Sequence, residues 1–277
     1  MESVCCGKRW DVILLRDGHG TITAALPYLI GSKLGLRYIL QPQLTQYNGP
    51  WFRPGTNVPA ATQQLIQELR KLHLTFYRQS FAPATPNIEA WQGYEKQARV
   101  TYRIEDISDP QQLFSHFDKR HRRTQIRSAS KVLHPADITP ETFADFHTRY
   151  WNSRGEDDLL SRSFIIRIIT AALQRGQGLL VAAADDSGVI HAARFVAFDA
   201  NSAYSLLSAL APDHHNGASP YTFWLILQQL AGKTRAFDFE GSMTPSIAHA
   251  YSLYGSQPTT FYQLTRCKNP IIRKIIK

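Results

Sequence analysis

The order of predicted elements after residue 177 constrains the fold more than any other feature of this sequence. In order, we predict strands at 178–184, 189–198 and 202–210, a helix at 220–231, a strand at 236–240, a helix at 246–254 and a strand at 259–265. Asp185-Asp-Ser-Gly188 supplies a hairpin turn within the first part of this series. A meander of strands followed by alternating helices and strands predicts an α+β domain with a mixed sheet covered by helices.

The first hundred residues are predicted to form a separate, strand-rich unit. Apolar runs at 10–16 and 21–30 flank a polar Asp17-Gly-His-Gly20 turn, which predicts a hairpin. Leu65, Ile66, Leu69 and Leu72 recur at helical spacing, so an amphipathic helix is expected from Val58 to Leu72. Further strands are expected at 36–40, 74–81 and 94–104.

A boundary is expected where this first set of strands and helix is complete. Ser108-Asp109-Pro110 is a helix start, which predicts units at 1–105 and 106–277. Helices are expected in the second unit at 110–117, 119–131, 140–152 and 161–175, before the meander begins.

Composition and charge exclude several classes of protein. With 43% apolar and 19% charged residues the chain is globular, and no run of about 18 apolar residues predicts a membrane span. The beginning of the chain lacks the basic and apolar regions of a secretory signal. Three cysteines, at positions 5, 6 and 267, are too few and too badly spaced for a disulfide framework or a zinc site. We therefore expect a cytoplasmic protein without a metal.

The net charge of +9 is concentrated in the first half of the chain. A basic surface favours anionic partners, such as nucleotide phosphates, tRNA, a polyanionic glycan or the inner membrane face, and by itself does not choose among them.

The loop from Leu210 to the helix start at Ser219-Pro220 is a candidate anion site. Small residues at Gly217, Ala218 and Ser219, with Asn216 before them, let a ligand approach the backbone, and the first amides of a helix attract an anion. This arrangement suits a pyrophosphate, and a bulky residue at position 217 is then expected to weaken donor binding with little effect on stability. The alternative is an ordinary turn between a strand and a helix.

Asp238 and Glu240 are the candidate general bases. Two apart on a predicted strand, they share one face, with Phe237 and Phe239 on the other, and partial burial raises a carboxylate pKa toward a useful value. Alternatively, one of them caps a helix or pairs with an arginine. His214 and His215 are the other candidate bases. Among the tyrosines, Tyr204, Tyr221 and Tyr254 could protonate a leaving thiolate, or belong to the core.

A basic helix opens the second unit. Arg123, Arg127 and Lys131 are spaced at i, i+4 and i+8, so they are expected along one face that holds a phosphate or a tRNA backbone, unless it is merely solvated. Lys33 and Arg37, near a strand end, are weaker candidates for the same task.

The element order and several short motifs resemble those of the Gcn5-related N-acetyltransferase (GNAT) superfamily, in its FemAB-like and BioF2-like branch. The motifs are Phe237-Asp-Phe-Glu-Gly-Ser242, the following helix that ends at Tyr254-Gly255, Tyr47-Asn-Gly-Pro50, the helix from Val58, and Arg122-Arg123-x-x-x-Arg127. The resemblance implies two GNAT-like units in tandem, the first of them trimmed. Tyr254 is then expected near the substrate.

The resemblance also implies a chemistry without metal or covalent intermediate, in which an amine attacks an activated acyl group directly. The implied donor is acetyl-CoA or another acyl-CoA, and in Fem-type enzymes aminoacyl-tRNA. Two departures bear on that choice: His214 and Ser219 replace the Gln/Arg and Gly/Ala of the usual phosphate loop, and Ala250-Tyr251 replaces a Phe-Lys pair that serves muramyl substrates.

We therefore expect an N-acyltransferase that moves an acyl group, acetyl in the first instance, from acyl-CoA to the amine of a small molecule, glycan or peptide. Fem-type aminoacyl transfer to cell-wall precursors is the first alternative. A non-catalytic module for anionic glycan or RNA is the alternative of another class. The acceptor and the oligomeric state are open.

Overall fold

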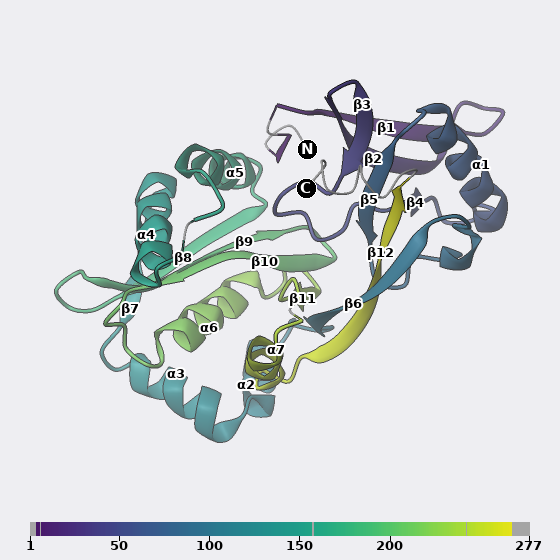
Figure 1. Cartoon of the computed structure of the whole chain (residues 1–277). Helices are drawn as coiled ribbons and strands as arrows, with labels where there is room; N and C mark the ends of the chain where they lie inside the picture. Colours follow the sequence, from purple (N-terminus) through teal and green to yellow (C-terminus); the bar gives the residue numbers. More distant parts are fainter. Residues whose placement is uncertain (1–3, 6, 157, 242, 268–277) are drawn as a thin grey trace. The chain divides into compact units, whose positions relative to one another are not determined.

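A computed structural model describes residues 4–5, 7–156, 158–241 and 243–267, and it divides into two compact units (Figure 1). The first comprises the residues up to Val100 together with those from Thr260 onward, and the second runs from Thr101 to Thr259. The division near residue 100 lies close to the expected one. The last strand, which the sequence pattern assigns to the second unit, groups largely with the first because it pairs with a strand there.

The first unit is a sheet with one long helix. Its strands are β1 (Arg9–Arg16), β2 (Ile22–Lys33), β3 (Leu36–Leu40), the short β4 (Trp51–Phe52), β5 (Phe76–Phe81), the beginning of β6 (Glu95–Ile104) and most of β12 (Gln257–Cys267). Within it the order is β1-β2-β3-β5-β12, and β4 pairs with β2. Only β3 and β5 run parallel; the other pairs are antiparallel.

The helix α1 (Val58–Lys71) forms where the apolar spacing predicts it. The side chain of Asn57 caps it by accepting from the Ala60 amide at 3.2 Å. Its buried face includes Leu65, Ile66 and Leu69, which pack with apolar side chains of the sheet. A short 3₁₀ turn, Ile88–Ala90, precedes β6.

The second unit confirms the α+β class. Its helices are α2 (Pro110–His116), α3 (Thr124–Ala129), α4 (Pro140–Ser153), α5 (Arg162–Gln174), α6 (Ala218–Leu230) and α7 (Pro245–Ser252). Its strands, in sheet order, are the end of β6, β11 (Ala236–Asp238), β10 (Ser202–Leu210), β9 (Ile190–Phe198), β8 (Gly178–Ala184) and β7 (His134–Ala136). Of these, β10 and β11 run parallel and the other neighbours are antiparallel. The three-residue β7 was not predicted.

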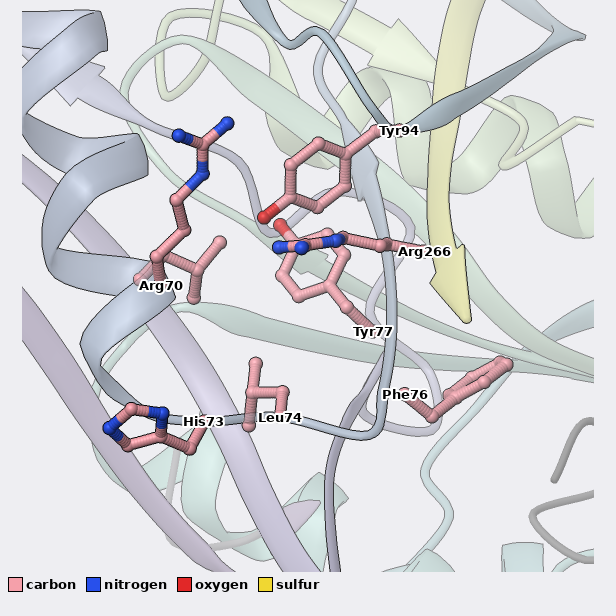
Figure 2. A pocket seen from close by; sticks show the side chains of 8 residues that line it. Arg70, His73, Leu74, Phe76, Tyr77, Tyr94 and Arg266 are labelled. Atoms are coloured by element: carbon pink, nitrogen blue, oxygen red, sulfur yellow. The ribbon is translucent and has the colours of Figure 1, made fainter. Parts of the chain in front are cut away.

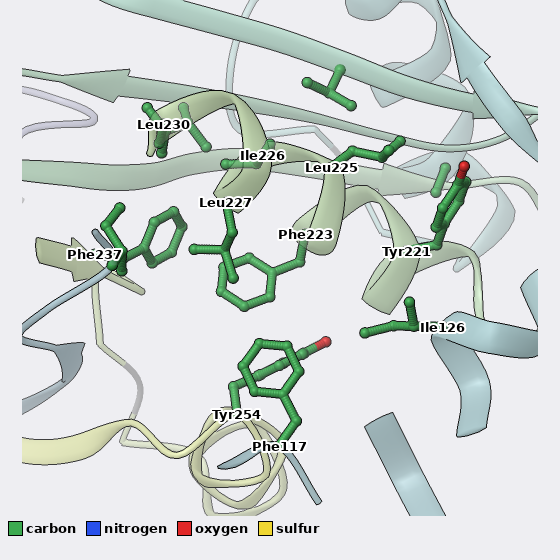
Figure 3. Packing of buried hydrophobic residues seen from close by; sticks show 14 of the residues in the cluster. Phe117, Ile126, Tyr221, Phe223, Leu225, Ile226, Leu227, Leu230, Phe237 and Tyr254 are labelled. Carbon is green, nitrogen blue, oxygen red and sulfur yellow. The ribbon is translucent and has the colours of Figure 1, made fainter. Parts of the chain in front are cut away.

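The core of this unit surrounds α6. Phe223 is fully buried and contacts the rings of Phe117, Phe237 and Tyr254 at centroid distances from 4.6 to 6.2 Å (Figure 3). Helices α4 and α5 contact β10 and β8, whereas α6 contacts β8 and β9 (Figure 1). The buried aromatic cluster therefore holds α6 rigidly against the sheet and sets the position of the loop at its N-terminus.

Two expected elements take a different form. The helix expected over 119–131 begins with a π-helical turn, Lys119–Arg123, and ends at Ala129. Arg123, which has a helical backbone at the start of α3, and Arg127 keep their i, i+4 spacing, but Lys131 lies beyond the helix end, so the expected i+8 member of the alignment is wrong. The strand expected over 236–240 ends at Asp238, because Glu240 has a left-handed backbone with φ of 62°.

Candidate active site in the second unit

The candidate site lies where two parallel strands separate. Residues Ser202, Ala203 and Tyr204 of β10 pair with Ala236, Phe237 and Asp238 of β11, and the pairing stops there. Beyond that point β10 continues to Leu210, and no described strand takes the place of β11 beside it. Backbone amides and carbonyls on that side of β10 are thus available to a ligand.

A β-bulge marks the point of separation. The register between β10 and β9 shifts between Ser205 and Leu207, directly after the last residue of β10 that pairs with β11. A bulge re-aims the groups around it, and such irregularities are frequent next to active sites.

The most unusual side chain here is Arg194 of β9, which the sequence analysis missed. The residue is 8% exposed. Its guanidinium donates from Nη1 to Ser205 Oγ at 2.8 Å and from Nη2 to Ser219 Oγ at 3.3 Å, and its Nε has no partner among the described residues. No carboxylate among the described residues pairs with it. Burial lowers the pKa of Arg194, and the nearby Tyr254 and Tyr251 oppose that shift. Hydrophobic periodicity gives no signal that an arginine within an apolar strand is buried and bonded to distant serines.

Asp238 is a structural carboxylate. It is fully buried, and it accepts hydrogen bonds from the Thr101 hydroxyl, from Arg103 Nη1 at 3.2 Å and from the Glu240 amide at 2.8 Å. These three donors fix the carboxylate in place and occupy its oxygens. Of the two roles considered for this residue, the geometry favours pairing with an arginine.

Glu240 is placed differently from the expectation. Because its backbone is left-handed, it does not continue the strand, and the premise that it shares a face with Asp238 is wrong. Its side chain is half-buried, and its charge contributes to raising the pKa of Tyr251. A strained non-glycine residue that a buried carboxylate holds in place is a feature found at functional sites.

Tyr251 and Tyr254 at the end of α7 complete the surroundings. Tyr251 stacks on Phe239 with a centroid distance of 4.5 Å, and burial raises its pKa. Tyr254 is 5% exposed and belongs to the core cluster; the guanidinium of Arg122 lies 4.5 Å from its ring centroid. Arg122 also donates to the Ala250 carbonyl at 2.9 Å, so it fastens α7 to the π turn.

The loop before α6 is closed by its own histidine. The Gly217 amide donates to His215 Nδ1 at 3.0 Å, and the Ala218 amide donates to the His215 carbonyl at 2.8 Å. The His215 amide in turn donates to His191 Nδ1 at 3.0 Å, and His191 Nε2 contacts Asp185 at 3.2 Å. Two amides that were expected to face an anion are therefore already satisfied.

The packing of α3 against residue 217, rather than the approach of a ligand, requires a glycine at this position. A Cβ at this position would lie 2.2 Å from the carbonyl oxygen of Gln125 in α3, and Gln125 Nε2 also contacts Asn216 Oδ1 at 3.3 Å. The glycine thus permits α3 to pack against the start of α6. The expectation that a bulky residue here has little effect on stability is wrong.

The remaining residues that were predicted for the site lie away from the place where β10 and β11 separate. His214 Nδ1 contacts the Ala211 carbonyl at 2.6 Å, and Leu210 lines a shallow hollow of about 390 Å³ with Arg149 and Tyr150. Arg127 and Lys131 are exposed, and Arg123 is half-buried. In the first unit, Lys33 and Arg37 are exposed on the β2–β3 hairpin.

The described residues contain no group of three or more His, Cys, Asp or Glu that could hold a metal ion. No helix in the same part of the chain is long and apolar enough to cross a membrane.

Comparison with known proteins agrees with this geometry. Residues 115–245 match the family model described as an acetyltransferase (GNAT) domain. Among solved structures, FemX is similar with a TM-score of 0.74 and 12% identity, covering 92% of this chain and 88% of that one. A tandem GNAT protein from the clavulanic acid biosynthesis pathway has a TM-score of 0.57 and 15% identity, covering 96% and 85%.

A third solved structure is the C-terminal domain of a putative lysylphosphatidylglycerol synthetase from Agrobacterium fabrum, with a TM-score of 0.54 and 12% identity, covering 92% of this chain and 84% of that one. No curated protein matches the sequence.

The diverging parallel strands, the bulge and the helix that follows them define a GNAT-type acyltransferase fold. Residues 115–245 thus match a GNAT acetyltransferase domain, and the fold is similar to that of FemX, in agreement with the resemblance of the sequence motifs.

Proposed function

We propose that this protein is an N-acyltransferase whose reaction takes place where β10 and β11 separate. The observation that carries the proposal is the buried Arg194, whose guanidinium is bonded to Ser205 at the bulge and lacks a carboxylate partner among the described residues. Keeping a cation buried without a counter-charge is costly, so its retention is best explained by a negative charge that arrives with the substrate or develops during the reaction.

In the acyl transfer, the chain's own residues perform three tasks. An amine nitrogen attacks the acyl carbon, a C–N bond forms, and the bond from that carbon to the leaving oxygen or sulfur breaks. Arg194 stabilises the negative charge on the carbonyl oxygen, and Glu240, directly or through water, takes the proton that the amine loses. Tyr251 gives a proton to the leaving group. Its raised pKa keeps its hydroxyl protonated, and the charges of Arg194 and Glu240 are close enough to affect that pKa.

Of the two donors considered, the geometry favours the aminoacyl ester of a tRNA. The loop amides of Gly217 and Ala218, where the pyrophosphate of an acyl-CoA was expected, are occupied by His215. The basic residues Arg127 and Lys131 are exposed and can contact an RNA backbone. The fold shared with FemX supports the same choice.

Acyl-CoA is the second candidate donor. It is favoured by the match of residues 115–245 to a family model described as an acetyltransferase domain, which includes the loop and α6. Its pyrophosphate would have to displace the hydrogen bonds of His215.

Thermal unfolding in the presence of charged tRNA, uncharged tRNA, acetyl-CoA and CoA tests the proposal, because a ligand that binds the native state raises the melting temperature. We expect charged tRNA to stabilise most, and transfer of a labelled amino acid to a panel of amines to require Arg194. Stabilisation by acetyl-CoA alone selects the second donor. No stabilisation by any of them contradicts the proposal and favours a non-catalytic binding module.

A further inference from the structure

The first unit contains a cavity that none of the motifs above explains. It has a volume of about 170 Å³ and lies among the end of α1, the start of β5 and the end of β12 (Figure 2). Its polar lining consists of two arginines and two tyrosines, Arg70, Arg266, Tyr77 and Tyr94, with His73 farther away. The two arginines distinguish this lining from the apolar core cluster beside it, to which both tyrosines belong.

The buried hydroxyl of Tyr77 is a hydrogen-bond donor that has no acceptor among the described residues. The side chain is 1% exposed, and its oxygen has no hydrogen-bond partner among the described residues. Leaving a buried hydroxyl unpaired is destabilising, so a partner supplied from outside the chain would relieve that cost. The Tyr77 and Tyr94 rings meet edge to face at 5.2 Å, and Figure 2 shows both hydroxyls directed toward the guanidinium of Arg266.

The charges around the cavity are of one sign. Arg266 donates to the Tyr94 hydroxyl, and the positive charge of Arg70 also acts on that group. No aspartate or glutamate lines the cavity. The acidic residue nearby on α1, Glu68, is paired with Lys71 at 2.6 Å. Two guanidinium groups without a lining counter-charge attract an anion.

Both phenols are donors at neutral pH. Burial raises the pKa of Tyr77 well above its usual value of 10.0, and burial also raises the pKa of Tyr94, against a smaller opposing effect of Arg266. Each hydroxyl therefore carries a proton that it can donate to an acceptor, and neither competes with the arginines for an anion.

We propose that this cavity is a binding site for an oxyanion, a phosphate or a carboxylate group, carried on a small apolar body. The arginines and the Tyr77 hydroxyl bind the anionic oxygens, as guanidinium forks do with planar or tetrahedral oxyanions. The apolar body rests on Leu69, Leu74 and Phe76, which form the rest of the wall. The lining offers few groups for sugar hydroxyls.

The test measures binding of inorganic phosphate and of benzoate to the full chain by calorimetry, with chloride at equal ionic strength as the reference. We expect at least one oxyanion to bind and chloride not to compete. A higher affinity for phosphate identifies a phosphate ester as the ligand type, and a higher affinity for benzoate identifies a carboxylate.

Tyr77→Phe is the decisive variant, because it removes only the unpartnered hydroxyl. Its melting temperature without anion should equal or exceed that of the wild type, while the dissociation constant of the oxyanion rises roughly three- to tenfold, the effect of one hydrogen bond. Arg266→Gln should weaken binding more than tenfold. Lys71→Gln, which removes the same charge from the neighbouring position on α1, is the matched control and should change binding less than twofold.

Equal binding by the wild type, Tyr77→Phe and Arg266→Gln, or the absence of oxyanion binding by the wild type, overturns the proposal. The result is independent of the acyl-transfer proposal, since every residue involved belongs to the first unit.

Discussion

Arg194 Nη1 donates to Ser205 Oγ at 2.8 Å, so a buried cation is fixed at the residue where β10 and β11 cease to pair. The same guanidinium reaches Ser219 in the first turn of α6. The strand separation, the bulge and the helix start are thereby linked through one positive charge.

Replacing Arg194 by Met separates function from stability. A buried charge without a carboxylate partner contributes little to folding, so the melting temperature of Arg194→Met should stay the same or rise. Acyl transfer should fall by about 10² to 10³, the usual effect of losing a group that stabilises an oxyanion. Arg167→Met, on the exposed surface of α5, is the control and should leave both unchanged. A fully active Arg194→Met excludes a role in the reaction.

Glu240→Gln tests the base. The change keeps the shape of the side chain but removes its ability to take a proton, so the chemical step should slow by about 10² to 10⁴ while donor affinity stays the same. The residual rate should then follow the fraction of free amine as pH rises. If Glu240→Gln reacts at the wild-type rate across pH 6 to 9 in single-turnover measurements, Glu240 is not the general base, and a histidine of the loop or a water molecule takes that role.

Gly217→Ala should destabilise the second unit. The added Cβ would lie 2.2 Å from the Gln125 carbonyl oxygen, so α3 and α6 must move apart. We expect the free energy of unfolding to fall by about 1 to 3 kcal/mol, as for an overpacked core. In Gly18→Ala nothing lies within 4 Å of the new Cβ, and that variant serves as the control in urea unfolding. An unchanged unfolding midpoint for Gly217→Ala contradicts the packing role.

Asp185 makes stability depend on acid pH. Hydrogen bonds from the Ser187 hydroxyl, from His191 and from the Val189 amide hold the pKa of Asp185 below its usual 3.8. A folded-state pKa that is lower than the unfolded one adds stability above about pH 4, and this contribution disappears as the pH falls through the folded-state pKa. The wild type should therefore be more stable than Asp185→Asn at pH 5, with a difference that narrows toward pH 2.5. A difference that is constant across this range contradicts the prediction.

The exposed basic residues should set the salt dependence of tRNA binding. Removing one phosphate-binding cation should reduce the slope of log affinity against log salt by about one. Arg127→Ala with Lys131→Ala should therefore flatten the slope by up to about two units, whereas Arg175→Ala with Lys233→Ala, at exposed positions elsewhere in the unit, should not. Equal slopes for both double variants indicate that the first pair is solvated.

Much of the architecture follows from local patterns in the sequence. The apolar spacing of Leu65, Ile66 and Leu69 predicts α1, and the runs at 178–184, 189–198 and 202–210 predict the meander with nearly the observed bounds. These elements are determined by side chains only a few positions apart, which is why the α+β class can be inferred from the sequence alone.

The candidate site depends on contacts between residues far apart in the chain. Whether Asp238 is a base or a structural carboxylate is decided by Thr101 and Arg103, more than 130 positions away. The left-handed backbone of Glu240 and the closing of the loop by His215 likewise have no signature in hydrophobic periodicity. The sequence by itself determined which elements form, because hydrophobic spacing acts locally. Only the tertiary structure decided which charges are paired and which, like Arg194, are buried without a counter-charge, because pairing and burial depend on what folding brings together.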